Sequence, residues 1–289
     1  MSDLLNARDQ RKSLKTLRIL AFLVVTIVTM GLLAQDAYAV RVSLQRVIFA
    51  GSKRSETLTL INNTAKDQTY RLGWKKFRMD EQQSLRAIEE GAPFDDILWA
   101  EKMVRFAPRR ITVAAGASQQ VRIMLRRPKE LADGEYRAHL WIVSEGEPPK
   151  FEADPDSTKQ AIRLSVQPAI SLPIFVRTGD LSGEANFSDV TLKPIEGGLS
   201  TSFTLNRVGD RSIYGDFDFV CTDGGKDVVL RQARGIAVYK EIDRRFLRYD
   251  LPLNETTTRS CNTVGITFRS SPNDPQFKGV TLAETSVSH

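Results

Sequence analysis

The segment from Ala161 to Arg177 constrains the fold more than any other part of the chain. Seven aliphatic residues in it share one parity: Ile162, Leu164, Val166, Ile170, Leu172, Ile174 and Val176. Successive side chains of a β-strand point to opposite faces, so these seven would line one face of a strand. Few ordinary strands, which run about 3–10 residues, hold that alternation so long. A long apolar edge strand is either covered or used to pair with another chain, and we interpret this one as used.

Two prolines, Pro168 and Pro173, interrupt this alternating segment. Proline has no N–H to donate to a sheet ladder, so it is tolerated mainly at sheet edges or bulges. The two are an odd number of residues apart, so in one regular strand their nitrogens would face opposite edges. One nitrogen would then face the neighbouring strand of its own domain. We therefore predict a bulge or bend near one of the two prolines.

Residues 1–39 are typical of a secretory signal peptide. A basic stretch precedes the apolar run from Ile19 to Leu33, and Ala37-Tyr38-Ala39 fits a small-x-small cleavage pattern. The apolar run is shorter than a membrane-spanning helix. We predict that the mature chain is exported and begins at Val40, with no membrane insertion after cleavage. An uncleaved anchor is the alternative.

The exported part is mildly basic. Removing residues 1–39 leaves 36 basic and 32 acidic residues, a formal net charge of +4. A nucleic-acid partner needs a concentrated basic stripe, and the basic residues here are interleaved with acids. The remaining 250 residues suit two domains of ordinary size. Cys221 and Cys261 both lie in this part, which favours one disulfide in an oxidising compartment; two buried free thiols are the alternative.

Short alternating segments separated by turn residues dominate the exported part, and helical periodicity is nearly absent. This pattern predicts an all-β fold with two immunoglobulin-like β-sandwich domains, residues 40–178 and 179–289. Seven strands are expected in the first domain, at 41–47, 57–61, 70–74, 104–106, 120–125, 136–143 and 161–177, with an acid-rich loop before residue 104. Four alternating segments mark the second, near 199–205, 217–221, 247–251 and 264–268. If the cysteines lie on its third and sixth strands, these strands are antiparallel neighbours and can be bridged.

The sequence offers no recognisable catalytic or metal site. His139 and His289 are the only histidines. No Ser/His/Asp triad, Cys/His pair or metal-ligand cluster can be assembled with ordinary spacing. We therefore predict a non-enzymatic protein with no metal and no cofactor.

Several motifs in the first half occur in a recognisable order. They are residues 45–52 (QRVIFAGS), 58–63 (LTLINN), 105–110 (RFAPRR), 115–123 (AGASQQVRI), 133–140 (DGEYRAHL) and 174–177 (IFVR). In this order and spacing, residues 41–178 resemble the PapD-like periplasmic chaperones, which assemble pili in the chaperone–usher pathway. The form of residues 133–137 and 175–179 is similar to a divergent, archaic branch of that family. Over 181–289 the resemblance is only architectural.

The resemblance implies two immunoglobulin-like domains set in an L, and a chaperone that lends a strand to an incomplete pilin subunit. Strand addition of this kind uses main-chain hydrogen bonds for affinity and alternate side chains for specificity. Ile162, Leu164 and Val166 are the first candidates for the donor strand, with Ile170 and Leu172 next. The alternative is that they pack only the core of their own domain. The implied partners are pilin subunits and an outer-membrane usher.

The family also holds the pilin's C-terminal carboxylate with an Arg and a Lys. Arg46 matches the Arg, but Pro173 stands where the Lys is expected. Arg105, Arg122 or Arg137 could substitute, and spacing does not choose among them. Glu135 and Arg177 match two members of the family's buried interdomain ion network. The third member, an Asp in the second domain, has no clear counterpart.

A secreted two-sandwich adhesin or carbohydrate-binding module is the alternative function. Such a module would display aromatic side chains clustered on one surface. Trp74, Trp99 and Trp141 are instead scattered along the sequence, and the first and last lie on expected core strands.

Overall fold

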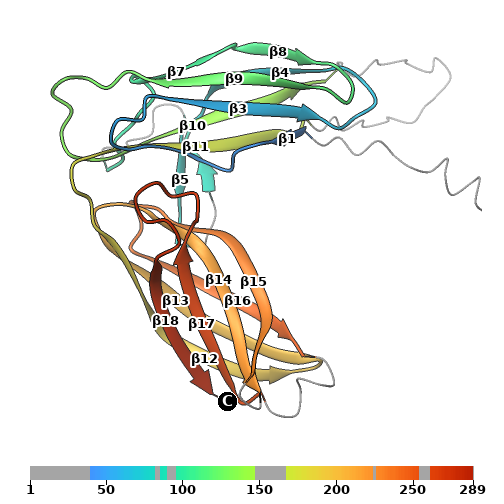
Figure 1. Ribbon diagram of the computed structural model, residues 1–289, viewed down its shortest axis with the longest axis vertical. Helices are drawn as coiled ribbons and strands as arrows, with labels where there is room; N and C mark the ends of the chain where they lie inside the picture. The colour runs from blue at the N-terminus through green and yellow to red at the C-terminus, as the bar shows by residue number, and fades with distance from the viewer. Residues whose placement is uncertain are drawn as a thin grey trace, which may run out of the picture.

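The computed structural model describes residues 40–81, 85–89, 96–146, 167–223, 226–253 and 261–288. Over these residues the chain forms strands and turns without a helix. Two β-sandwiches meet at an angle, so the molecule is bent like an L (Figure 1). The expected signal peptide and the three first donor-strand candidates, Ile162, Leu164 and Val166, lie outside the described residues.

The first sandwich is made of two sheets. One contains, in spatial order, β1 (Val40–Val42), β3 (Ser55–Asn62), β9 (Ser118–Leu125) and β7 (Val104–Ala107). The other contains β2 (Val47–Phe49), β11 (Ala169–Thr178), β10 (Gly134–Glu145), β4 (Gln68–Trp74) and β8 (Arg110–Val113). The prediction of a single strand over residues 41–47 is wrong, because the chain changes sheets between β1 and β2.

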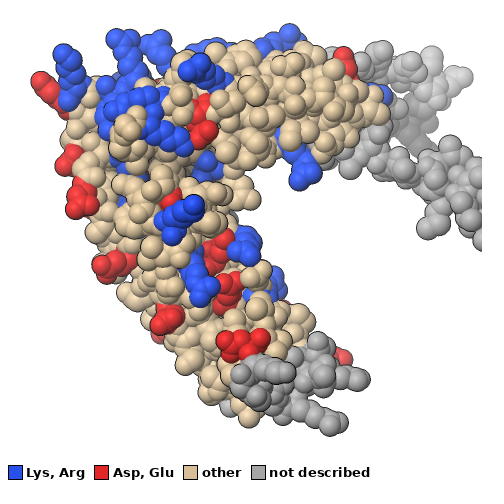
Figure 2. All heavy atoms as spheres, in the orientation of Figure 1, with Lys and Arg blue, Asp and Glu red and all other residues tan. Residues whose placement is uncertain are grey.

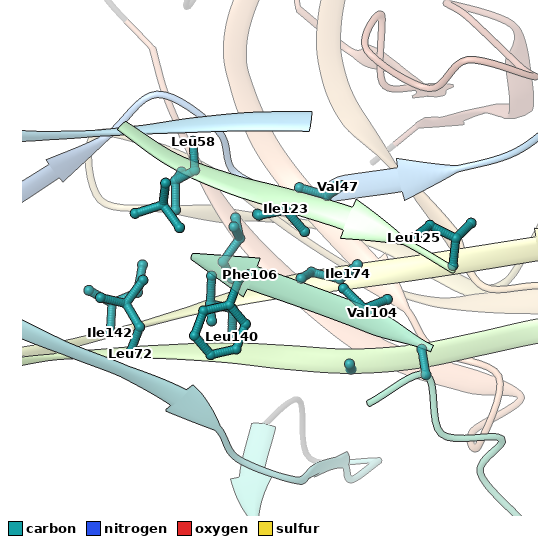
Figure 3. Packing of buried hydrophobic residues seen from close by; sticks show 14 of the residues in the cluster. Val47, Leu58, Leu72, Val104, Phe106, Ile123, Leu125, Leu140, Ile142 and Ile174 are labelled. Carbon is teal, nitrogen blue, oxygen red and sulfur yellow. The ribbon is translucent and has the colours of Figure 1, made fainter. Parts of the chain in front are cut away.

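The core of the first sandwich comes from side chains that alternate along these strands. In β9 and β7, buried and exposed residues take turns, as expected when one face packs and the other meets water. Figure 3 shows Leu58 and Ile123 from one sheet pointing toward Leu72, Leu140 and Ile174 from the other. Each such aliphatic side chain contributes about 1.5–3 kcal/mol when it is fully buried.

A hairpin extends from the first sandwich toward the second. It consists of β5 (Phe77–Met79) and β6 (Leu85–Ala87), which pair antiparallel near the bend (Figure 1). Met79 is buried in the core of the second sandwich, not the first. This hairpin lies within the segment that the sequence predicted to be only an acid-rich loop. Short strands with little alternation give no periodic signal.

The second sandwich also consists of two sheets. One contains, in spatial order, β12 (Gly183–Ile195), β13 (Gly198–Gly209) and β16 (Arg244–Pro252). The other contains β15 (Lys226–Val238), β14 (Ile213–Asp223), β17 (Thr263–Ser270) and β18 (Thr281–Ser288). Phe203, Phe217 and Phe268 are fully buried between them, and the rings of Phe217 and Phe268 lie 4.7 Å apart. Aromatic rings bury large areas, which suits them to this core.

The predicted disulfide is present between Cys221 and Cys261. β14 and β17 are antiparallel neighbours, and Cys221 lies opposite Val264 in their ladder. The end of β14 therefore lies beside the start of β17, and the two cysteine Cα atoms are 5.8 Å apart. That separation lies within the range that a disulfide spans.

β11 contains Pro173 and is directly preceded by Pro168, and neither lies at a bulge, so the prediction of a bulge or bend near one of them is wrong. Its ladder with β10 is regular from Val143–Ala169 to Gly134–Thr178. Pro173 lies opposite His139, whose carbonyl accepts a hydrogen bond from Lys75 of the β4 side, so the Pro173 nitrogen faces away from β10. Pro168 does face β10, but it precedes the strand and only its carbonyl is used there.

Candidate functional site

The outer side of β11 has two parts with different neighbours. Ile174 to Val176 pair in parallel with β2, whereas Ala169 to Pro173 have no strand beside them among the described residues. Because the register with β10 is regular, the backbone N–H and C=O groups of Ala169 and Ser171 face this open side. An open strand edge offers hydrogen bonds to another chain. Among the described residues, Ala169 to Pro173 of β11 thus form a short unpaired edge that ends where the pairing with β2 begins.

The side chains of β11 separate by parity as the sequence predicted. Leu172, Ile174 and Val176 are buried in the core of the first sandwich, and Ile170 packs partly against it. Leu172 lies opposite Leu140 in the ladder, so this donor-strand candidate packs the core of its own domain in the free chain. The roles of Ile162, Leu164 and Val166 stay predictions, because these residues lie outside the described residues.

Arg46 lies at the end of this open edge. It precedes Val47, which pairs with Ile174, so Arg46 is level with Pro173 across the parallel ladder. Arg46 is one of the residues that line a cleft of about 540 Å³ between the two domains. The cleft is lined by Val42, Ser43, Leu44, Gln45, Arg46, Ile48, Lys53, Glu56, Tyr214, Ser271, Asn273 and Pro275.

The Arg46 guanidinium is held by aromatic rings and not by carboxylates. Its Cζ lies 3.3 Å from the ring centroid of Tyr214 and 5.0 Å from that of Phe175. Its Nε and Nη1 atoms have no hydrogen-bond partner among the described residues. Burial is the main cause that lowers the pKa of Arg46, and the cation Arg177 adds to this. A guanidinium whose N–H groups have no partner can donate two parallel hydrogen bonds to a carboxylate that reaches it.

The cleft contains one further cation among the described residues that line it, Lys53. Its Nζ lies 2.5 Å from the Glu56 carboxylate, and 38% of its side chain is exposed. The substitutes suggested by the sequence are placed elsewhere. Arg105 and Arg122 are exposed on β7 and β9, in the other sheet of the sandwich, and Arg137 is paired in the domain interface.

Glu135 and Arg177 form the expected buried ion pair, and the structure supplies its third member. The Nε atom of Arg177 donates to Glu135 at 2.9 Å, and Nη1 donates to Asp274 of the second domain at 3.1 Å. All three side chains are at most 3% exposed. Burial raises the pKa of Asp274, but Arg177 and a backbone hydrogen bond from Gln276 outweigh it and the net direction is down. The Asp lies in a turn after β17, where no sequence pattern marked it.

A second buried ion pair crosses the interface and was not predicted. Arg137 of β10 donates to Glu241 of the second domain through Nη1 at 2.8 Å and Nη2 at 2.7 Å. Nη2 also donates to the carbonyl of Phe77, and Glu241 accepts from the backbone N–H of Met79. The pair therefore joins the hairpin β5–β6 to both sandwiches.

His139 lies in the same interface as a neutral, buried group. Its ring packs against Phe77 and Tyr239, and both ring nitrogens lack hydrogen-bond partners among the described residues. Burial, followed by the nearby cations Arg137 and Arg46, lowers the pKa of His139 to about 3. The His139 side chain is therefore uncharged at neutral pH.

The distribution of charged side chains over the surface agrees with the mildly basic net charge of the chain. Figure 2 shows Lys and Arg gathered on the first domain near the bend, while acidic and basic residues are mixed along the second domain. In the part of the chain that the structure describes, no cluster of His, Cys, Asp and Glu has the size needed for a metal ion. The same residues contain no helix with the length and apolar character to cross a membrane.

Comparisons with known proteins give similarities at the level of solved structures. No family model and no curated protein matches the chain. A chain of the CsuC–CsuE chaperone–tip adhesion subunit pre-assembly complex, from archaic chaperone–usher pili of Acinetobacter baumannii, is 12% identical; the match covers 85% of this chain and 97% of that one, with a TM-score of 0.44. A chain of the Salmonella enterica SafA pilin in complex with the SafB chaperone is 14% identical; the match covers 89% of this chain and 99% of that one, with a TM-score of 0.40.

The Escherichia coli chaperone DraB matches over 87% of this chain and 96% of its own, at 15% identity and a TM-score of 0.37. These three structures are thus one chaperone and two complexes of a chaperone with a pilin or a tip adhesion subunit.

Proposed function

We propose that this protein is a non-enzymatic periplasmic chaperone that binds incomplete pilin subunits by strand addition and delivers them to an outer-membrane usher. The subunit would add a strand to the open side of β11 and to the segment before it. Its C-terminal carboxylate would bind Arg46. No nucleotide is required, because the subunit gains its missing strand on binding.

The observation that carries this proposal is the position of Arg46 beside the open edge. The guanidinium has unpartnered N–H groups in a cleft, level with the residue at which the unpaired side of β11 ends. A strand that pairs with Ala169 and Ser171 and then ends would bring its terminal carboxylate to this cation. Lys53 lines the same cleft and is our candidate for the second positive charge in place of the family's Lys.

The proposal is tested by co-expressing the mature chain with a candidate pilin, an immunoglobulin-like subunit that lacks its last strand. We expect a one-to-one complex, measured by size-exclusion chromatography with light scattering. Leu164→Asp should abolish it, because a charge would have to enter the apolar groove of the subunit. Arg46→Ala should weaken it by about 2–5 kcal/mol, the usual cost of removing one member of a buried charge pair.

Two controls sharpen this experiment. Arg105→Ala removes an exposed guanidinium on another sheet and should leave the complex as in the wild type. A pilin that carries its own missing strand as a fused extension should not bind, because its groove is already filled. Wild-type complex yield from both Leu164→Asp and Arg46→Ala would contradict the proposal.

The adhesin alternative is not favoured by the described surface. Trp74 packs edge-on against Phe106 at 4.9 Å, and Trp141 lies beside Phe77 and Lys75. The exposed large hydrophobic residues are Leu98, Met124, Ile195, Val208, Val229, Phe246 and Val280. A sugar-binding face would need several exposed aromatic rings, and this set contains one.

A further inference from the structure

The bidentate pair of Arg137 and Glu241 occupies an unusual position in the domain interface. Their side chains are 4% and 1% exposed. Besides each other, they bind backbone groups of the hairpin: Arg137 donates to the carbonyl of Phe77, and Glu241 accepts from Met79. Two charged side chains thus fix three elements at once, namely β10, the β5–β6 hairpin and the turn between β15 and β16.

This pair is separate from the Glu135–Arg177–Asp274 network. Glu135 and Arg137 lie two residues apart on β10, on the face that meets the second domain, and they bind different parts of that domain. A single attachment between two bodies leaves them free to rotate about that point, whereas a second attachment restricts the rotation to the line through both points. Together with the apolar contacts of Ile48, Phe175 and Met79, the two ion pairs therefore restrict the angle between the sandwiches more than either pair does alone.

A chain of ring contacts connects this second attachment to Arg46. Tyr239 lies two residues before Glu241, and the Arg137 Cζ is 4.4 Å from the centroid of its ring. The Tyr239 ring meets Phe175 edge-on at 5.6 Å, and Phe175 in turn lies 5.0 Å from the Arg46 Cζ. Tyr239 is buried, so a displacement of its ring would also move the Phe175 ring, which lies beside the Arg46 guanidinium.

We propose that Glu241 is a positioning residue for the interdomain cleft: by holding Arg137 and the hairpin, it sets the angle between the domains and the place of the Arg46 guanidinium. Arg137 acts with it as its partner. The inference concerns the free chain alone. Its failure and the failure of the proposed function are therefore separate outcomes.

The test measures the interdomain distance in the free protein. Spin labels are attached through Ser118→Cys on β9 and Lys193→Cys on β12, both exposed, and the native cysteines are joined in a disulfide. Pulsed dipolar spectroscopy gives the distance distribution. We expect a narrow distribution in the wild type, and a broader one with a shifted mean in Glu241→Gln.

A second readout follows Arg46 itself. Phenylglyoxal modifies accessible arginines, and mass spectrometry of peptides gives the rate at each position. Modification of Arg46 should accelerate several-fold in Glu241→Gln, while exposed arginines such as Arg105 keep their wild-type rate. Glu81→Gln is the matched control, because the Glu81–Arg244 pair also links hairpin and second domain but is 60% and 66% exposed. It should change neither readout.

A double variant separates positioning from folding. Glu241→Gln leaves Arg137 buried without its counter-charge and could unfold the chain. Arg137→Met with Glu241→Leu replaces the pair by apolar groups of similar size, a change that buried ion pairs often tolerate. We expect this protein to fold, with a broadened distance distribution and faster Arg46 modification. A distribution as narrow as the wild type, with unchanged Arg46 reactivity, would overturn the proposal.

Discussion

Single residues in the interface owe their properties to burial between two domains. Arg46 has free N–H groups because aromatic rings surround it, and His139 is neutral because it is buried beside two cations. The sequence identified Arg46, Glu135 and Arg177 through motifs that resemble a family. It could not identify Asp274 or Glu241, because each lies in a turn of the second domain and meets its partner only after both domains have folded.

His139 should make the stability of the protein depend on pH above the range in which carboxylates titrate. Its pKa is lowered to about 3 in the folded chain, whereas an unfolded histidine titrates near 6.5. The unfolded chain thus binds more protons between these values, so the free energy of unfolding falls as the pH drops from 6.5 toward 3. The slope should approach about 1.4 kcal/mol per pH unit, measured by urea unfolding.

His139→Leu removes the titrating group and should flatten the curve between pH 6.5 and 5. His289→Ala, which removes the only other histidine, should retain the wild-type slope. An equal slope in His139→Leu and the wild type would refute this assignment.

At the scale of strands, the alternation of apolar and polar residues predicted a strand well where one of its faces is buried and poorly where neither face is. The segments around Leu72, Phe203 and Val264 are strands with alternating burial, as expected. The strands β12, β15 and β18 were not predicted. All three lie at sheet edges, and β18 is mostly exposed or half-buried, so its side chains need no regular apolar pattern. The change of sheet between β1 and β2 likewise leaves no periodic mark.

Glycine at one position of β14 is required by the ladder with β17. A Cβ added to Gly215 would collide with the backbone carbonyl of Arg269, which cannot move without breaking the sheet. Gly215→Ala should therefore destabilise the protein by about 1–3 kcal/mol, the usual cost of overpacking. The thermal unfolding midpoint and urea unfolding at pH 7 measure this loss.

Gly265 on β17 is the matched control. A Cβ there would meet only the carbonyl oxygen of Val220, at an ordinary contact distance of 3.6 Å. Gly265→Ala should leave stability within about 1 kcal/mol of the wild type. If both substitutions cost the same, the collision at Gly215 is not the cause.

On the scale of the whole molecule, the two sandwiches are joined by buried charges as well as by apolar contacts. Ile48 and Phe175 of the first domain belong to the core cluster of the second, together with Met79 of the hairpin. The sequence predicted two sandwiches and a network between them, but not the hairpin or the second ion pair. The ion pair joins residues 104 positions apart, which no local pattern encodes. The strands of the hairpin are too short to give a periodic signal.

Arg177→Met should uncouple the two sandwiches. It leaves the carboxylates of Glu135 and Asp274 buried without their shared cation, which costs about 3–5 kcal/mol. All three tryptophans lie in the first domain, so their fluorescence reports its unfolding, while far-ultraviolet circular dichroism reports both domains. The two urea transitions should coincide in the wild type and separate in the variant.

Arg269→Met provides the comparison for this experiment. It removes a partly exposed ion pair with Asp218 within the second domain, worth at most about 1 kcal/mol. Its two transitions should stay together. Coincident transitions in Arg177→Met would show that the remaining contacts, the Arg137–Glu241 pair and the shared apolar cluster, are enough to couple the domains.

The ring of Pro173 has one more effect, on any strand laid along β11. Ala169 and Ser171 each offer a donor and an acceptor to a newcomer, whereas Pro173 offers an acceptor only. Hydrogen bonds to an added strand can form from Ala169 onward and must stop at Pro173, where β2 begins on the same side of β11. The missing backbone N–H of Pro173 thus sets the position at which an added strand has to end.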